Sequence, residues 1–386
     1  MFSCSVSRSH IGCLVVPLLC MTSQVLLAQP SQAKSAASST QSPNPSTHAK
    51  SNVDPDALWD GRQMMPFRAI DNPKMVTAAQ ASDFLGDEEY VLGLSINGES
   101  RAYPTRFASF HHAINDNIGN MTTGGTVAVA ITYCSVCNTG LAFSSIVDDK
   151  TLMLDFYGLY NGVVTVFDRN TESVWLQVSG RAVKGPLTGK KLKTLPLLDT
   201  TWGQWKKLHP DTIVMSPDNP FQKFYRPKGV AEPRGYTRFP MPQFASTLTR
   251  NDERLPQFDK VLAVTLPLPA EDALRRAYPI KALEKANGII NDTLGDTPVV
   301  ALLDLPTATA YAASRVLDGK TLTFEARKQP NGQFATYDKE TGSRWNLVGK
   351  AEAGPLAGKS LTRVDNHLSQ WYGWAAFFPD TTIFGQ

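Results

Sequence analysis

The two halves of this chain repeat each other's motifs. Short segments within residues 101–212 recur in the same order within residues 276–381, and the offset drifts by only a few positions. The matched pairs are Arg101-Ala102-Tyr103-Pro104 with Arg276-Ala277-Tyr278-Pro279, Ile114-Asn115-Asp116 with Ile290-Asn291-Asp292, Gly185-Pro186-Leu187 with Gly354-Pro355-Leu356, and Pro210-Asp211-Thr212 with Pro379-Asp380-Thr381. Chance explains one such match but not an ordered series, so we expect two tandem, divergent repeats of one domain.

The length of the chain and the repeat together set the expected domain boundaries. At 386 residues, the chain is longer than a single hydrophobic core usually supports. We expect the first repeat at 55–225 and the second, degenerate repeat at 255–386. A connector that contains Pro and Arg joins them at 226–254.

Hydrophobic periodicity predicts a mainly β fold with a few helices (α+β) in each repeat. The β-branched run 126–133 is typical of a buried strand, and Asp168-Arg169-Asn170-Thr171 has the residues of a hairpin turn. Further strands are expected at 141–144, 152–157, 163–167 and 174–178, and helices at 77–84, 105–114 and 202–208. Each repeat is therefore expected to be an antiparallel β-rich domain.

The N-terminus has the pattern of an export signal. Arg8 precedes an apolar run at 11–20, and Ala28 offers a small residue for cleavage. We expect a signal peptide over 1–28 and a disordered, Ser/Ala/Pro-rich tether over 29–54. Polar residues at 22–24 interrupt the apolar run, which argues against a permanent transmembrane helix at this place. We expect no transmembrane segment after cleavage of the signal. The mature protein is therefore expected to be periplasmic or secreted.

Two cysteines remain after cleavage of this signal, Cys134 and Cys137, in the segment Tyr133-Cys134-Ser135-Val136-Cys137-Asn138-Thr139-Gly140. No helical period follows them, so the thioredoxin fold is not expected. A strand that runs into a Cys-x-x-Cys turn instead resembles the knuckle that presents two sulfurs to one metal ion. The second repeat has Leu305-Pro306-Thr307-Ala308-Thr309 in this place and has lost both thiols.

Histidines are the natural further ligands, and the chain has six. His111 and His112 lie at the end of an expected helix, where neighbouring side chains point about 100° apart, so at most one of them should face the cysteines. Both are absent from the second repeat, which has Asn287 and Gly288. Joint loss from two separate segments suggests that a histidine and both cysteines form one site.

Simpler interpretations compete with each of these assignments. Cys134 and Cys137 could form a structural disulfide, since exported thiols usually pair. His111 or His112 could be an ordinary helix-end histidine. His209 corresponds to Phe378 in the second repeat, so packing explains it as well as metal ligation does.

Other classes of function lack a signal in this sequence. The formal net charge of +3 and the absence of a Lys/Arg run give no reason to expect nucleic-acid binding. The sequence has no nucleophile elbow, P-loop, dinucleotide fingerprint or His-Glu-x-x-His motif.

Taken together, these motifs resemble the domain of unknown function 3179 family. The matching stretches are 69–74, 92–104, His111 with 114–116, 132–137, 167–175, 185–187, 202–212 and 254–256. The resemblance implies an exported or membrane-linked bacterial or archaeal protein without an established reaction. It also implies a histidine at His111, a carboxylate at His112 and often a methionine where this chain has Val166. A His, two Cys and a Met would be a soft-metal set that suits copper above all.

Three functions follow as hypotheses. The leading one is soft-metal binding, of copper or zinc, or metal-linked redox chemistry on Cys134, Cys137 and His111, with His112 and His209 as further possible ligands. The second is a periplasmic thiol–disulfide or peroxide-type enzyme that uses Cys134 and Cys137. The third is a noncatalytic binding module with a structural disulfide. Whether the protein is an enzyme stays open at this point, and its partners stay unknown.

Overall fold

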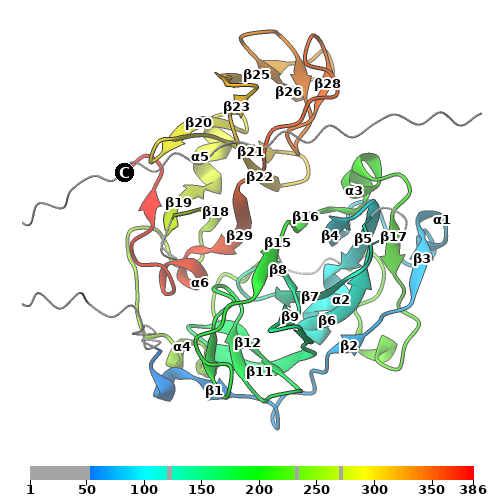
Figure 1. Ribbon diagram of the computed structural model, residues 1–386, viewed down its shortest axis with the longest axis vertical. Coiled ribbons are helices and arrows are strands. Elements are labelled where there is room, and N and C mark those ends of the chain that lie inside the picture. Colours follow the sequence, from blue (N-terminus) through cyan, green and yellow to red (C-terminus); the bar gives the residue numbers. More distant parts are fainter. Residues whose placement is uncertain (1–52, 120–123, 231–233, 269–272) are drawn as a thin grey trace, which may run out of the picture. The chain divides into compact units, whose positions relative to one another are not determined.

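The computed structural model describes residues 53–119, 124–230, 234–268 and 273–386 (Figure 1). The predicted signal peptide, residues 29–52 of the predicted tether and their cysteines lie outside these residues. All described elements belong to one unit that spans residues 48–386. No helix in the described ranges is long and apolar enough to cross a membrane.

The prediction of a mainly β protein with a few helices is confirmed, since strands make up 43% and helices 12% of the structure. The α-helices are α1 (Ala78–Ala81), α2 (Thr105–His111), α3 (Trp202–Leu208), α4 (Pro242–Ser246), α5 (Ile280–Lys285) and α6 (Trp371–Ala375), with 3-10 turns η1 (Pro55–Ala57) and η2 (Gln222–Phe224). The helix expected at 105–114 ends earlier than predicted. His112 adopts the left-handed conformation (φ 56°) that ends the helix, and β6 begins at the next residue.

Three sheets and one short hairpin form the first half. The first sheet has the order β16 (Leu198–Thr201), β4 (Tyr90–Ile96), β5 (Glu99–Pro104), β17 (Ile213–Met215), β3 (Met75–Thr77). The second has the order β15 (Lys193–Leu195), β8 (Thr139–Ser144), β7 (Val127–Cys134), β6 (Ala113–Ile118), β2 (Ile70–Asp71). The third has the order β1 (Trp59–Asp60), β11 (Leu154–Tyr160), β12 (Val163–Asp168), β13 (Val174–Leu176), β14 (Ala182–Lys184). The hairpin pairs β9 (Ile146–Val147) with β10 (Lys150–Thr151).

The second half has three sheets and a short hairpin as well. Its first sheet has the order β29 (Asp365–Gln370), β18 (Lys260–Pro267), β19 (Ala273–Pro279), β30 (Thr382–Ile383). The next is β20 (Ile289–Leu294), β21 (Thr297–Asp304), β22 (Thr309–Ser314), and the last is β25 (Phe324–Lys328), β26 (Phe334–Asp338), β27 (Arg344–Trp345), β28 (Ala351–Ala353). The hairpin pairs β23 (Val316–Leu317) with β24 (Lys320–Thr321). Most pairs are antiparallel, but β17 runs parallel to β5 and β30 runs parallel to β19.

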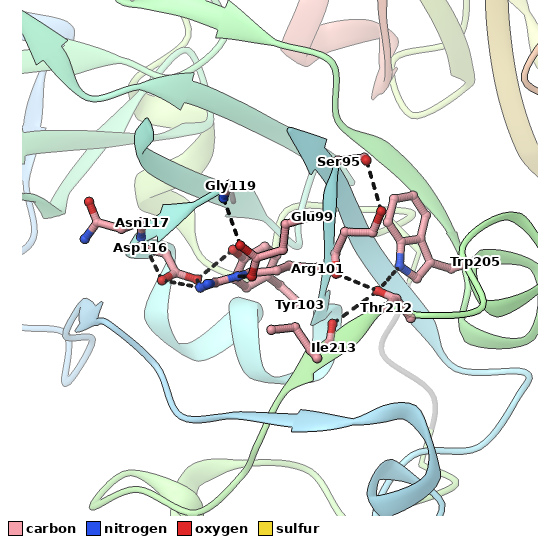
Figure 2. A network of polar contacts seen from close by, with 11 residues as sticks. Ser95, Glu99, Arg101, Tyr103, Asp116, Asn117, Gly119, Trp205, Thr212 and Ile213 are labelled. Carbon is pink, nitrogen blue, oxygen red and sulfur yellow. Dashed lines mark hydrogen bonds and ion pairs between the residues drawn. The ribbon is translucent and has the colours of Figure 1, made fainter. Parts of the chain in front are cut away.

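A buried ion pair joins the first two sheets of the first half (Figure 2). Arg101 on β5 places Nη1 2.7 Å from both carboxylate oxygens of Asp116 on β6, and the Tyr103 hydroxyl donates to the same carboxylate at 2.8 Å. Glu99 accepts from Arg101 Nε at 2.6 Å and from the Gly119 amide at 2.9 Å. Because Arg101 and Asp116 are largely shielded from solvent, removal of either side chain would leave the other without its closest ionic partner in a poorly hydrated place.

Equivalent contacts occur at the matched motifs of the second half. Arg276 Nη1 and the Tyr278 hydroxyl both reach Asp292 Oδ2, at 2.6 and 2.9 Å. Trp374 Nε1 donates to Thr381 Oγ1 at 2.9 Å, as Trp205 does to Thr212 at 2.8 Å. The recurring motifs therefore make equivalent structural contacts in both halves. The predicted duplication and its domain boundaries stay predictions, and superposition of the halves tests them.

Candidate functional site

The two cysteines lie in the turn of a β-hairpin. Cys134 ends β7 and pairs with Thr139, the first residue of β8. Asn138 closes the turn in the left-handed conformation (φ 51°), which Asn tolerates better than most residues, and its side chain accepts from the Tyr133 hydroxyl at 3.2 Å. No helix follows the second cysteine, because the chain continues directly into β8.

The two thiols are buried but differ in their chemistry. Both are unpaired and have no exposed surface. Burial by itself raises the pKa of the Cys134 thiol. Hydrogen bonds from the Cys137 thiol and from the backbone amides of Cys137, Val164 and Val136 lower it by more. The pKa of Cys134 therefore lies below its ordinary value. Burial and the neighbouring Cys134 raise the pKa of Cys137 well above that value. Cys134 is therefore the sulfur that carries negative charge more readily.

Of the two adjacent histidines, His112 shares a cavity with Cys134. The cavity has a volume of about 190 Å³. Apart from these two side chains and a few serine and tyrosine groups, its walls are apolar and include Trp59, Phe67, Phe156, Val164, Met241 and Phe244. The imidazole of His112 packs edge-on against Phe67, with 4.4 Å between ring centroids. Its Nδ1 lies 2.8 Å from the Tyr133 carbonyl oxygen, and burial lowers its pKa to about 4.

His111 is engaged elsewhere. Its Nδ1 lies 2.7 Å from the Arg68 carbonyl oxygen and its Nε2 lies 2.5 Å from the Tyr225 hydroxyl. Burial lowers its pKa to about 4. His111 is the last residue of α2, whereas His112 follows it in the left-handed conformation. The contacts of the two side chains favour His112 over His111 as the partner of the cysteines.

His209 lies in a separate group of residues. Its Nδ1 is 3.0 Å from Ser100 Oγ and its ring packs on Trp205, with centroids 4.1 Å apart. It lines a different cavity, together with Glu99, Ser100 and Asp211. Within the described parts of the chain, no group of three or more His, Cys, Asp or Glu side chains is arranged to hold a metal ion. The combination of Cys134, Cys137 and His111 is thus not among such groups.

The second half and the connector cover the cysteine turn. The amide of Gln370 donates to the Cys137 carbonyl at 2.9 Å, and the amide of Tyr236 donates to the Val136 carbonyl at 3.0 Å. Tyr372 on α6 lies against Cys137, and burial raises the pKa of its phenol well above the ordinary value. Cys134 and Cys137 share one hydrophobic core with Trp371, Tyr372 and Trp374. Sequence reasoning missed these covering residues because nothing local links them to the hairpin.

The corresponding hairpin of the second half shows what replaces the thiols. Asp304 ends β21 and pairs with Thr309, as Cys134 pairs with Thr139. Thr307 stands three residues later, and its hydroxyl donates to Asp304 Oδ2 at 2.5 Å. A larger cavity of about 1110 Å³ lies beside this hairpin, and Gly288 and Ala326 are among its lining residues. The second half thus keeps the hairpin while a carboxylate and a hydroxyl occupy the thiol positions.

Most of the chain matches a known protein family. The family described as "Protein of unknown function (DUF3179)" matches residues 65–381. The chain belongs to the DUF3179 family. This confirms the resemblance seen in the sequence motifs. The matched range of this DUF3179 protein includes the cysteine hairpin, the connector and α6. Neither a curated protein nor a solved structure matches it.

Proposed function

We propose that this DUF3179 protein is a thiol redox enzyme in which Cys134 and Cys137 alternate between dithiol and disulfide. The observation that carries the proposal is the asymmetry of the two sulfurs. Hydrogen bonds from three backbone amides and from the Cys137 thiol favour the thiolate of Cys134, whereas burial and the charge of Cys134 keep Cys137 protonated. One sulfur is thus prepared to attack and the other to resolve the intermediate.

The redox step balances with a disulfide substrate as oxidant. The Cys134 thiolate attacks one sulfur of the substrate, a mixed disulfide forms and the second substrate sulfur leaves as a thiolate. Cys137 then loses its proton to that thiolate and attacks Cys134 Sγ. A Cys134–Cys137 disulfide forms and the substrate leaves fully reduced, having gained two electrons. The reverse sequence oxidises a dithiol.

The predicted export signal supports this proposal, since it would carry the pair into an oxidising compartment where such a cycle has partners. The predicted copper or zinc ion is the competing hypothesis. In that case Cys134 and Cys137 would supply two sulfurs, and His112, rather than His111, lies on the same cavity. The structural disulfide is the third hypothesis.

The deciding experiment is a redox titration of the full-length protein in dithiothreitol buffers, combined with metal analysis and thiol labelling by methyl methanethiosulfonate. We expect a reversible two-electron transition and no stoichiometric metal. The Cys137→Ser variant retains Cys134 and the Cys134→Ser variant retains Cys137. We expect the labelling rate to rise at lower pH in Cys137→Ser than in Cys134→Ser. One equivalent of copper or zinc that disappears in Cys134→Ser would establish the metal site instead. A disulfide that resists reduction, and whose loss only lowers stability, would establish the structural role.

A further inference from the structure

The cavity beside Cys134 has features that select a class of substrate. Its volume of about 190 Å³ lies below the roughly 300 Å³ at which pockets for small-molecule ligands usually begin. Among the residues that the structure describes, its lining includes no Asp, Glu, Lys or Arg. A charged molecule would lose its hydration in this cavity without gaining an ionic partner. The cavity therefore suits a small, uncharged molecule with an apolar body.

The lining of the cavity includes both exposed and buried residues. Pro240 on its wall is exposed and Met65 and Met241 are half-buried, whereas Cys134 is fully buried. Cys134 supplies the thiol and His112 the imidazole among its described lining residues. Peptide disulfides such as oxidised glutathione are both charged and too large for this space.

His112 lines the same cavity as Cys134 and has one ring nitrogen free to accept a proton. A carbonyl oxygen only accepts hydrogen bonds, so the contact with the Tyr133 carbonyl fixes the proton on Nδ1 and leaves Nε2 as an acceptor. Burial keeps the ring neutral, because it lowers the pKa to about 4. Neutral His112 can accept a proton from the Cys134 thiol and return it to a leaving oxygen, which is the behaviour of a general base that then acts as a general acid.

We propose that this cavity is the substrate site for a small, uncharged organic hydroperoxide, and that His112 carries the proton of its reduction by Cys134. This inference rests on the proposed redox function and names its oxidant. The Cys134 sulfur attacks the terminal peroxide oxygen, the S–O bond forms, the O–O bond breaks and two electrons pass from sulfur to the peroxide. His112 takes the thiol proton and delivers it to the departing alkoxide, so an alcohol leaves.

The resolving step regenerates the cycle. The Cys137 thiol attacks the sulfenic sulfur of Cys134, the S–S bond forms, the S–O bond breaks, and the hydroxyl leaves as water with the Cys137 proton. An external dithiol then reduces the disulfide and is itself oxidised to a disulfide. Atoms and electrons balance in both steps.

The test measures disulfide formation in the reduced full-length protein after addition of tert-butyl hydroperoxide, hydrogen peroxide or oxidised glutathione. We expect tert-butyl hydroperoxide to react at least tenfold faster than oxidised glutathione and faster than hydrogen peroxide. Met241→Trp places a larger side chain on the half-buried wall of the cavity and should slow tert-butyl hydroperoxide at least tenfold while hydrogen peroxide changes less. Met64→Trp is the matched control, because Met64 is 67% exposed and is not among the lining residues of the cavity.

His112→Asn tests the proton carrier. Asn tolerates the positive φ of this position. Its amide keeps a donor but lacks a group that titrates. We expect the hydroperoxide rate of the variant to fall at neutral pH and to recover as the pH approaches the pKa of the thiol, whereas a purely structural loss would lower the rate at every pH.

The outcomes separate this inference from the proposed function. If dithiothreitol buffers cycle the cysteines but hydroperoxides react no faster than oxidised glutathione, the hydroperoxide site is wrong and the redox function stands. Unchanged kinetics in Met241→Trp would also overturn the cavity as the substrate site. If no oxidant forms the disulfide, both proposals fail.

Discussion

The backbone amide of Gln370 donates a hydrogen bond to the carbonyl oxygen of Cys137 over 2.9 Å, although the two residues come from opposite halves of the chain. Thr139 Oγ1 strengthens the same junction by donating to Ser369 Oγ, also over 2.9 Å. The thiol-bearing turn is therefore held by residues of a half that has no cysteine of its own.

Gly373 on α6 packs closely against the cysteine turn. A Cβ atom at Gly373 would lie 3.1 Å from the Cβ of Cys137 and 3.2 Å from Cγ2 of Val163. We expect Gly373→Ala to lower the free energy of unfolding by about 1–3 kcal/mol through overpacking, as measured by urea denaturation. Gly86→Ala is the control, because its Cβ would meet only Glu89 Oε1, at 3.7 Å. Equal small losses at both sites would contradict tight packing of α6 on the cysteines.

Acid should destabilise the protein through its buried histidines. Burial lowers the pKa of His111, His112 and His367 from 6.5 to about 4. Between these values the unfolded chain binds more protons than the folded one, so stability is full above pH 6.5 and falls as the pH drops toward 4. Each histidine contributes up to about 1.4 kcal/mol per pH unit in this window.

His367→Leu offers the check on this pH dependence. Within the described structure, His367 Nε2 is buried without a hydrogen-bond partner, and its ring packs 5.2 Å from Trp374. Urea denaturation between pH 4 and 7 should show a shallower loss of stability in the variant than in the wild type. An unchanged slope would mean that His367 is already charged in the folded protein or titrates normally.

We expect the turn aspartates Asp168 and Asp338 to contribute equally to the free energy of unfolding. Asp168 Oδ2 accepts from Trp175 Nε1 at 2.9 Å, and Asp338 Oδ2 accepts from Trp345 Nε1 at 2.9 Å. Replacing either carboxylate with Ala leaves a buried indole donor unpaired, so we expect each variant to lose about 1–3 kcal/mol in urea denaturation. The exposed Asp83→Ala serves as control. Strongly unequal losses would argue against equivalent roles.

Arg234 in the connector should stabilise the fold through a buried ion pair. Its Nη1 lies 2.7 Å from Asp199 Oδ1, and its guanidinium stacks 3.6 Å above the centroid of the Tyr90 ring. Arg234→Met leaves the Asp199 charge buried, so we expect a loss of about 3–5 kcal/mol by calorimetry or urea denaturation. Arg234→Met combined with Asp199→Asn should recover part of this loss. A double variant as unstable as the sum of the two single variants would contradict the pairing.

Local patterns made much of the fold predictable. The β-branched run before Cys134 and the turn residues around Asp168 identify strands and hairpins because side-chain periodicity reports which face is buried. Helix geometry was the ground for predicting that at most one of the two adjacent histidines faces the cysteines. That geometry does not apply to His112, which lies just outside α2 with a positive φ that its residue type does not predict.

The environment of the thiols could not be predicted from the sequence. The amide of Val164, which helps to lower the pKa of Cys134, comes from a strand far along the chain, and the α6 residues that cover Cys137 come from the other half. Such contacts depend on tertiary packing rather than on local spacing. Only Tyr372 differs locally in a way that could have indicated its role in covering the turn. It stands between two matched Trp residues, at the position where the first half has Gly203.

The cover of the cysteine turn by Gln370 and α6 has a consequence for biosynthesis. Cys137 gains its full shield only when residues 370–375, close to the C-terminal Gln386, have been made and have docked. Before these residues have docked, the cysteine turn therefore lacks this cover, although its own hairpin is local in sequence and can form earlier. Docking of α6 thus protects the dithiol from oxidants and from other thiols, and removal of α6 would withdraw that protection.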